Sequence, residues 1–245
     1  IYNGPEKEGL ANTDPEALKA VLKAVKDIEI QANVEESTNE PLVDAAKLKG
    51  GKVVKETQGA YGSTVWTLKN GLKVVVKPTE FKKDQVILNL YKEGGRTLLT
   101  QDELYSFEEN VWQVFTAMAG VSKFPKQVLN KMLAGKYASA YPTVSGVQHG
   151  ISGNCQPKDI ETALQLMYLT FTDMRFDEQE FANAMGQIQA VLPNILNTPD
   201  FALQTEIQKT LYVNNPRTVI LNEENLAKVN LQTMEKAYRK MFNNV

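Results

Sequence analysis

The residues of this chain that could perform chemistry are few and widely spaced. Its 245 residues include one histidine, His149, and one cysteine, Cys155. A catalytic zinc ion takes three protein ligands and a structural zinc takes four, so one imidazole and one thiol cannot build a histidine- or cysteine-rich zinc site. His149 stands in a predicted strand, where a lone histidine is most often structural. We therefore interpret it as a structural residue and not as a metal ligand.

Cys155 carries the one thiol of the chain and is therefore the one candidate cysteine nucleophile. It lies just before a predicted helix, and the N-terminus of a helix could lower the pKa of its thiol. No second histidine is present to activate it, so we interpret the thiol as inert. A single cysteine excludes an internal disulfide, but it does not fix the compartment of the protein.

Three charged residues are candidates for catalytic or binding groups. Glu108 and Glu109 are adjacent, so on a helix they point about 100° apart and form a poor catalytic pair. We interpret them as part of a solvated face. Lys136 could bind a peptide carboxylate, but one cation in a strand is more often structural. The glycines at 94–95 and 150–153 lack the spacing of a phosphate-binding loop and are expected to end strands.

The composition is that of an ordinary globular protein. Hydrophobic residues make up 42% and charged residues 23%, and 27 Lys and Arg stand against 29 Asp and Glu. The basic residues are scattered, which makes nucleic acid a poor candidate partner. No apolar run approaches the ~20 residues of a membrane span. The chain begins at Ile1 without an initiator Met or signal-peptide pattern and stops at Val245 after an amphipathic helix, so we expect it to be part of a longer protein.

The N-terminal quarter is predicted to be a helix followed by a linker. Asp14-Pro15-Glu16, after Thr13, is typical of a helix start. An apolar stripe follows at helical spacing, and we expect other domains of the same molecule to cover it. Residues 35–59 show little periodicity. We therefore assign residues 1–59 to a helical linker and residues 60–245 to a folded domain. The stripe consists of Leu18, Val21, Leu22, Val25 and Ile28.

The domain contains strands first and then mostly helices. Residues 64–68 and 72–77 flank Lys69-Asn70-Gly71, and Asn-Gly is the strongest short signal for a β-hairpin. Leu72, Val74 and Val76 are expected to share one face. Further strands are predicted at 85–91, 136–144 and 146–153. Helices are predicted at 102–118, 125–133, from 157 onward, and at 177–197, 199–212, 222–228 and 231–242. In the helix that begins at 157, one face is predicted to align Ile160, Leu164, Met167 and Phe171.

This order of elements predicts the fold class. Three strands, two helices, two strands and then several helices indicate an α+β domain, in which helices pack on one face of an antiparallel sheet.

An ordered set of short motifs resembles the insulinase/pitrilysin-type zinc peptidases, in particular the long bacterial members common in Bacteroidetes. The set begins with the hairpin segment Trp66 to Thr79 and continues through Phe81-Lys82 to Gly94-Gly95. It also includes Leu133 to Lys136, Ser152-Gly153-Asn154 and Pro157 to Leu166. The resemblance covers about residues 60–245.

The resemblance implies a place in a larger enzyme. In that family two halves, each of two similar α+β domains, close around a peptide. Only the first domain carries the inverted zinc motif His-x-x-Glu-His, with a further Glu as third ligand. Two histidines four residues apart lie on one helical face, and the Glu between them activates the water bound to zinc.

This chain departs from the active pattern at both ligand positions. The first motif would fall near Glu108-Glu109-Asn110-Val111-Trp112-Gln113, and the third ligand near Ala182 to Gln187. Neither segment contains the ligands. The resemblance therefore implies the linker and third, non-catalytic domain of such a peptidase. It implies no catalytic, cofactor-binding or metal-binding residue here, and zinc in the N-terminal half of the parent.

The partners implied by the resemblance are the N-terminal half, the fourth domain of the same parent and a peptide substrate, in the periplasm or cell envelope. An exposed sheet edge could hold that peptide. One alternative is a scaffold or assembly subunit from an inactive member of the family, which the absence of His-x-x-Glu-His upstream would indicate. The other is an independent enzyme that uses carboxylates or Cys155.

Overall fold

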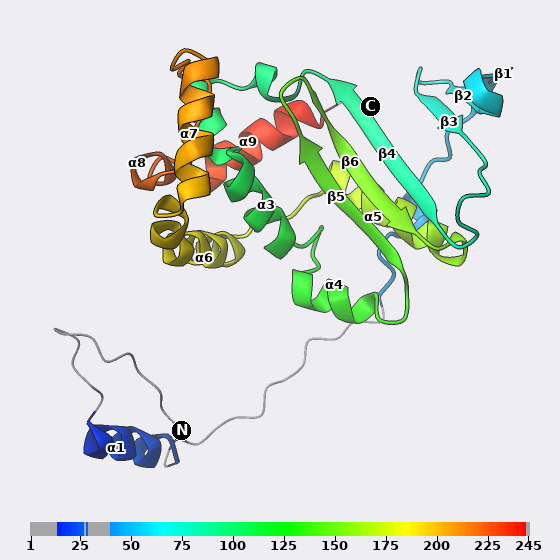
Figure 1. Cartoon of the computed structure of the whole chain (residues 1–245). Coiled ribbons are helices and arrows are strands. Elements are labelled where there is room, and N and C mark those ends of the chain that lie inside the picture. The colour runs from blue at the N-terminus through cyan, green and yellow to red at the C-terminus, as the bar shows by residue number, and fades with distance from the viewer. Residues whose placement is uncertain (1–13, 27, 29–39, 244–245) are drawn as a thin grey trace. The chain divides into compact units, whose positions relative to one another are not determined.

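The computed structural model describes residues 14–26, 28 and 40–243 (Figure 1). The chain divides into two compact parts, residues 1–36 and 37–245. In the first part, helix α1 (Pro15–Lys26) begins as predicted, with the Asp14 carboxylate accepting from the Glu16 amide at 3.1 Å. Thr13 lies outside the described residues. The apolar side chains of α1, from Leu18 to Val25, are all exposed.

The second part contains two antiparallel sheets of three strands each, and not the single sheet predicted from the order of elements. The first has the order β1 (Val53–Gln58), β2 (Thr64–Leu68) and β3 (Lys73–Val76). The predicted hairpin is confirmed, because β2 pairs with β3 across a turn in which Gly71 has φ 88°.

Strand β1 corrects the expectation of an irregular linker at 35–59. All six of its residues are exposed, so burial leaves no alternating pattern in the sequence. Backbone pairing with β2 holds it in place instead. The domain boundary at residue 60 remains a prediction.

The second sheet has the order β4 (Val86–Glu93), β6 (Gln148–Cys155) and β5 (Ala138–Val144). One of its faces turns apolar side chains, including Leu90 and Ile151, into the main core, whereas Tyr91 and Tyr141 are exposed on the other. Helix α5 packs along β5 and β6 (Figure 1). The predicted α+β class, with helices packed on one face of an antiparallel sheet, is therefore confirmed for this sheet.

The helices of the second part follow the predicted order. They are α2 (Gln101–Ser106), α3 (Glu109–Met118), α4 (Lys126–Met132), α5 (Ile160–Thr172), α6 (Glu178–Leu196), α7 (Pro199–Leu211), α8 (Glu223–Leu226) and α9 (Leu231–Met241). Short 3-10 turns occur at Ala45–Lys47, Ala60–Gly62, Gly95–Leu98 and Pro157–Asp159.

Two helix expectations were wrong in detail. The single helix expected at 102–118 is broken between α2 and α3, because Phe107 ends α2 and turns its ring to stack on Trp112, with ring centroids 4.6 Å apart. In α5 the aligned stripe was misplaced: Ile160 and Leu164 are exposed, and Ala163 and Leu166 are buried. Helix α5 is apolar on several sides, so its sequence fits more than one stripe.

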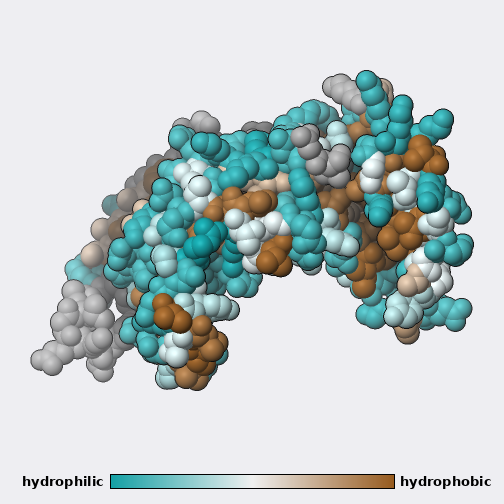
Figure 2. All heavy atoms as spheres, turned by 90° about the horizontal axis from the view of Figure 1, so that it is seen from above, coloured by the Kyte–Doolittle hydropathy of each residue, from teal (hydrophilic) through white to brown (hydrophobic). Residues whose placement is uncertain are grey.

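Helix α9 closes the main core. Its Tyr238 is 1% exposed, donates its hydroxyl to the Thr170 carbonyl at 2.5 Å and stacks on Phe242 at 4.1 Å. On the face seen in Figure 2, apolar side chains form separate patches among hydrophilic ones. Within the described residues, no helix combines the length and apolarity needed to cross a bilayer.

Candidate functional site

His149, the one histidine, is a structural residue inside the fold. It is 2% exposed. Its Nδ1 accepts the Gly95 amide at 3.2 Å, and its Nε2 lies 2.8 Å from the Met241 carbonyl, which can only accept. Burial lowers the pKa of the imidazole, and the Met241 carbonyl opposes this shift. Both nitrogens are engaged, so the neutral ring has no lone pair left for a metal.

Cys155 is placed where its thiol is least reactive. The side chain is fully buried at the end of β6. Burial raises the pKa of the thiol, and the nearby carboxylate of Asp159 raises it further. A helix N-terminus could have lowered this pKa, but burial and charge outweigh it here. The arrangement does not activate a nucleophile.

Glu108 corrects the interpretation of Glu108 and Glu109 as one solvated helix face. The Glu108 carboxylate caps α3 by accepting the amides of Asn110 at 2.9 Å and Val111 at 3.1 Å. Glu109 is exposed and accepts the Gln113 side-chain amide at 3.3 Å. The two carboxylates therefore have separate structural roles.

Lys136 and the segments that would carry a zinc site show no catalytic arrangement. Lys136 donates to the Thr162 hydroxyl at 3.1 Å. Residues 108–113 and 182–187 belong to the start of α3 and to α6, which pack side by side. In the described part of the chain, no three His, Cys, Asp or Glu side chains are grouped so that they could hold a metal ion.

The free edge of β5 was not among the site features predicted from the sequence. Within the described residues β5 pairs on one side only, with β6. The Tyr137 carbonyl accepts from the Gln156 amide at 3.0 Å, and the Ser145 amide donates to the Gln148 carbonyl at 2.8 Å. Hydrogen-bonding direction alternates along a strand. The backbone groups of the even-numbered residues therefore face away from β6, including those of Ala140, Pro142 and Val144.

Pro142 agrees with this alternation. Proline has no N–H, so a strand accepts it where the amide would point to a free edge. The outward side of β5 thus offers carbonyl oxygens at Ala140, Pro142 and Val144 and amides at Ala140 and Val144. A proline within a predicted strand was the sequence signal that could have identified this edge.

A groove of about 740 Å³ follows this edge, between β5 and α3. Trp112 lies in its wall, and its indole Nε1 is buried without a hydrogen-bond partner among the described residues. Arg96 and Glu109 stand at the Ser145 end. The β5 side consists of residues 139–146, and the facing side includes Trp112, Gln113, Thr116, Ala117 and Lys126.

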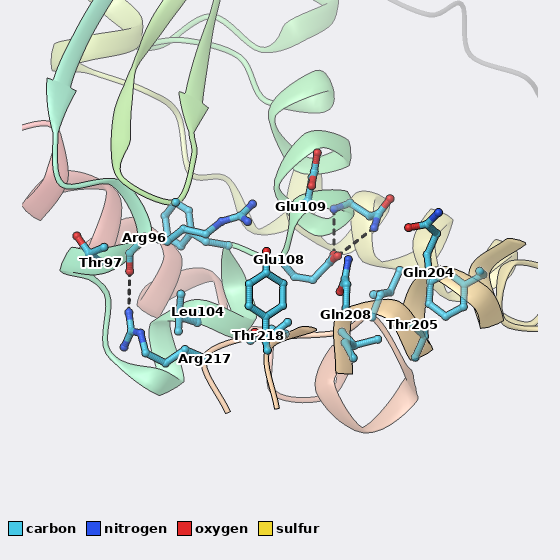
Figure 3. A pocket seen from close by; sticks show the side chains of 18 residues that line it. Arg96, Thr97, Leu104, Glu108, Glu109, Gln204, Thr205, Gln208, Arg217 and Thr218 are labelled. Carbon is cyan, nitrogen blue, oxygen red and sulfur yellow. Dashed lines mark hydrogen bonds between the residues drawn. The ribbon is translucent and has the colours of Figure 1, made fainter. Parts of the chain in front are cut away.

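A second cavity of about 450 Å³ shares Arg96, Glu109 and Gly146 with the groove (Figure 3). Helix α7 supplies Gln204 and Gln208 to its wall. These side chains add polar groups to the cavity, and the three shared residues place it beside the end of the β5 groove.

Arg217 fixes one wall of this second cavity. Its guanidinium donates to the Arg96 carbonyl at 2.8 Å and to the Leu99 carbonyl at 3.0 Å. The chain after β4 is therefore held firmly where the two cavities meet.

This fold occurs in known proteins whose structures have been solved. No family model and no curated protein matches the chain. Solved structures do match. The periplasmic protease PqqL from Escherichia coli has a TM-score of 0.65 at 20% identity, over 95% of this chain and 25% of that one. A mutant of the ferredoxin protease FusC, in complex with Arabidopsis ferredoxin, has a TM-score of 0.66 at 17% identity. This match covers 95% of this chain and 26% of that one.

A third match is a protease from Helicobacter pylori, with a TM-score of 0.54 at 15% identity, over 78% of this chain and 44% of that one. At such identities the likeness shows a shared fold alone. The chain spans about a quarter of the length of the first two structures.

Proposed function

We propose that this chain is a non-catalytic domain of a larger peptidase and that it holds an extended peptide along the free edge of β5. The fold that it shares with three proteases supports this assignment. So does the resemblance of its motifs to the insulinase/pitrilysin-type zinc peptidases, where they would belong to the third of four domains. Its partners would be the N-terminal half and the fourth domain of the parent, and the periplasmic location of PqqL supports the same location here.

The observation that carries the proposal is the open edge of β5 beside a groove. An extended peptide can add to such an edge through main-chain hydrogen bonds, while a neighbouring groove receives alternate side chains. The outward amides and carbonyls of Ala140 and Val144 supply those bonds. Trp112 lies in the facing wall, but it is 4% exposed and its indole Nε1 is buried, so the main-chain groups of β5 supply the hydrogen bonds.

Catalysis would reside elsewhere in the parent. A zinc ion bound in the N-terminal half would polarise the peptide bond and activate water. In this chain the contribution would be shape and hydrogen bonding, because both nitrogens of His149 are engaged and the Cys155 thiol is buried.

Edge pairing can be tested with N-methylated peptides. Two forms of one extended ten-residue peptide would be compared with the unmodified form by fluorescence anisotropy, one methylated at its odd and one at its even amides. Every other amide faces β5, so we expect one form to lose at least about tenfold in affinity and the other to bind like the unmodified peptide. Equal loss in both forms, or no binding of the unmodified peptide, would contradict the proposal.

The non-catalytic role has its own test. Metal analysis of the purified chain should find no stoichiometric zinc, and broad peptide substrates should remain uncleaved. A parent that contains the N-terminal half should bind zinc and cleave peptides. One tightly held zinc ion per chain of 245 residues would overturn the assignment.

A further inference from the structure

Arg96 is an arginine whose guanidinium has no partner within the described part of the chain. Its Nε is buried and makes no hydrogen bond. Figure 3 shows the side chain extending into the second cavity, toward Glu108 and Glu109, with no hydrogen bond drawn from its guanidinium. The Glu108 carboxylate is occupied in capping α3, and Glu109 accepts from Gln113. Neither forms an ion pair with Arg96.

The backbone around Arg96 is fixed in place. Gly95 has φ 49°. A Cβ at this position would lie 2.5 Å from the Ser145 carbonyl oxygen and 2.5 Å from the Gln148 amide nitrogen, so only glycine allows the backbone to come this close to the turn between β5 and β6. The Arg96 amide donates to the Ser145 carbonyl at 2.9 Å. Arg217 holds the Arg96 carbonyl. The backbone of Arg96 is thus held against the turn that follows β5.

An unpartnered arginine in this setting is suited to a carboxylate. The Nε and one Nη form a planar fork that matches the two oxygens of a carboxylate, and a buried Nε without an acceptor is unfavourable until such a group arrives. Arg96 lines both the β5 groove and the adjoining cavity, so a ligand in the groove can reach it.

We propose that Arg96 forms a carboxylate-binding subsite at the Ser145 end of the β5 groove, which selects extended peptides that carry a negative charge there. This inference rests on the proposed peptide-binding role of β5. A peptide antiparallel to β5 would place residues near its N-terminus beside Arg96, and the carboxylate would belong to an Asp or Glu side chain. A parallel peptide would bring its C-terminal carboxylate to the same point.

The experiment compares matched ten-residue peptides of alternating Thr and Val against the whole chain by fluorescence anisotropy. One pair carries Glu or Gln near an acetylated N-terminus, with an amidated C-terminus. A second pair carries Gln there and differs only in a free or amidated C-terminus. We expect the charged member of one pair to bind about tenfold more tightly than its neutral partner. The pair that shows the preference identifies the source of the carboxylate.

Variants then assign the preference to Arg96. Arg96→Gln should bring the ratio of affinities for charged and neutral peptides close to one, and its circular-dichroism spectrum reports whether the variant is folded. Arg96→Lys should keep only part of the preference, because ammonium lacks the planar fork. Lys158→Gln, which removes an equal charge from a residue outside both cavities, should leave the ratio unchanged.

The outcomes separate the two proposals. Equal binding of charged and neutral peptides, or a preference that survives in Arg96→Gln, would overturn the Arg96 subsite and leave the β5 edge in place. Failure of every peptide to bind would overturn both.

Discussion

The backbone amide of Gly95 donates a hydrogen bond to Nδ1 of His149, at 3.2 Å. Because the opposite ring nitrogen meets the Met241 carbonyl at 2.8 Å, the imidazole is neutral with its proton on Nε2. One buried side chain thus joins the centre of the second sheet to the turn after β4 and to the end of α9. A second proton would occupy Nδ1 and abolish the bond from Gly95.

We expect the protein to lose stability as the pH falls below about 6.5. Burial holds the pKa of His149 in the folded protein below its ordinary value of 6.5, and the positive charge of Lys92 also lowers it. At pH values between the folded and the unfolded pKa of His149, the unfolded chain binds more protons than the folded one. The free energy of unfolding therefore rises with pH over this range, and the contribution of His149 is fully present above pH 6.5. Urea unfolding from pH 5.5 to 7.5 measures this slope.

His149→Gln provides the control for that slope. It should flatten the dependence on pH and, by disturbing two buried hydrogen bonds, cost about 1–3 kcal/mol at pH 7.5. The same slope in wild type and variant would show that another group is responsible.

Glu108→Ala should destabilise the protein by about 1 kcal/mol, because it removes the acceptor for two free amides at the start of α3. Glu109→Ala removes the same charge one residue later from an exposed position, and should change stability by less than about 0.5 kcal/mol. Thermal unfolding of both variants makes the comparison. Equal effects would mean that charge near the helix start matters and capping does not.

Cys155 should resist thiol reagents in the folded protein. The buried thiol has a raised pKa, so the thiolate that reacts is both scarce and inaccessible. We expect labelling by iodoacetamide to be at least about 100-fold faster in denaturant than in buffer at the same pH. Rapid labelling of the native chain would restore Cys155 as a candidate nucleophile.

Local signals predicted the elements of this fold well. The Asn70-Gly71 turn and the alternation of Val86, Leu88 and Leu90 each depend on a few neighbouring residues, and β2, β3 and β4 formed accordingly. Strand β1 escaped prediction because backbone pairing with β2, and not burial, stabilises it.

The candidate site was harder to predict, because it depends on which residues meet in space. The Arg96 guanidinium reaches the β5 groove only because Gly95 packs against Ser145, 50 positions later in the chain, and no spacing in the sequence reports this contact. The free edge of β5 follows from sheet order, and Pro142 was the one local sequence signal for it. By contrast, the absence of a second histidine was visible from composition, and the assignment of zinc to another half of the parent remains a prediction.

Two glycines give a matched test of the second sheet. A Cβ on Gly150 in β6 would lie 1.8 Å from the Leu90 carbonyl oxygen and 2.8 Å from the Tyr91 Cα, both rigid backbone atoms of β4. Gly150→Ala should therefore separate β4 from β6 and cost at least about 3 kcal/mol. Gly186 lies inside α6 with nothing within 4 Å of its Cβ position, so Gly186→Ala should stabilise the protein by about 0.5–1 kcal/mol. Chemical unfolding of both variants measures these changes in stability. A Gly150→Ala protein as stable as wild type would contradict the close approach of β4 to β6.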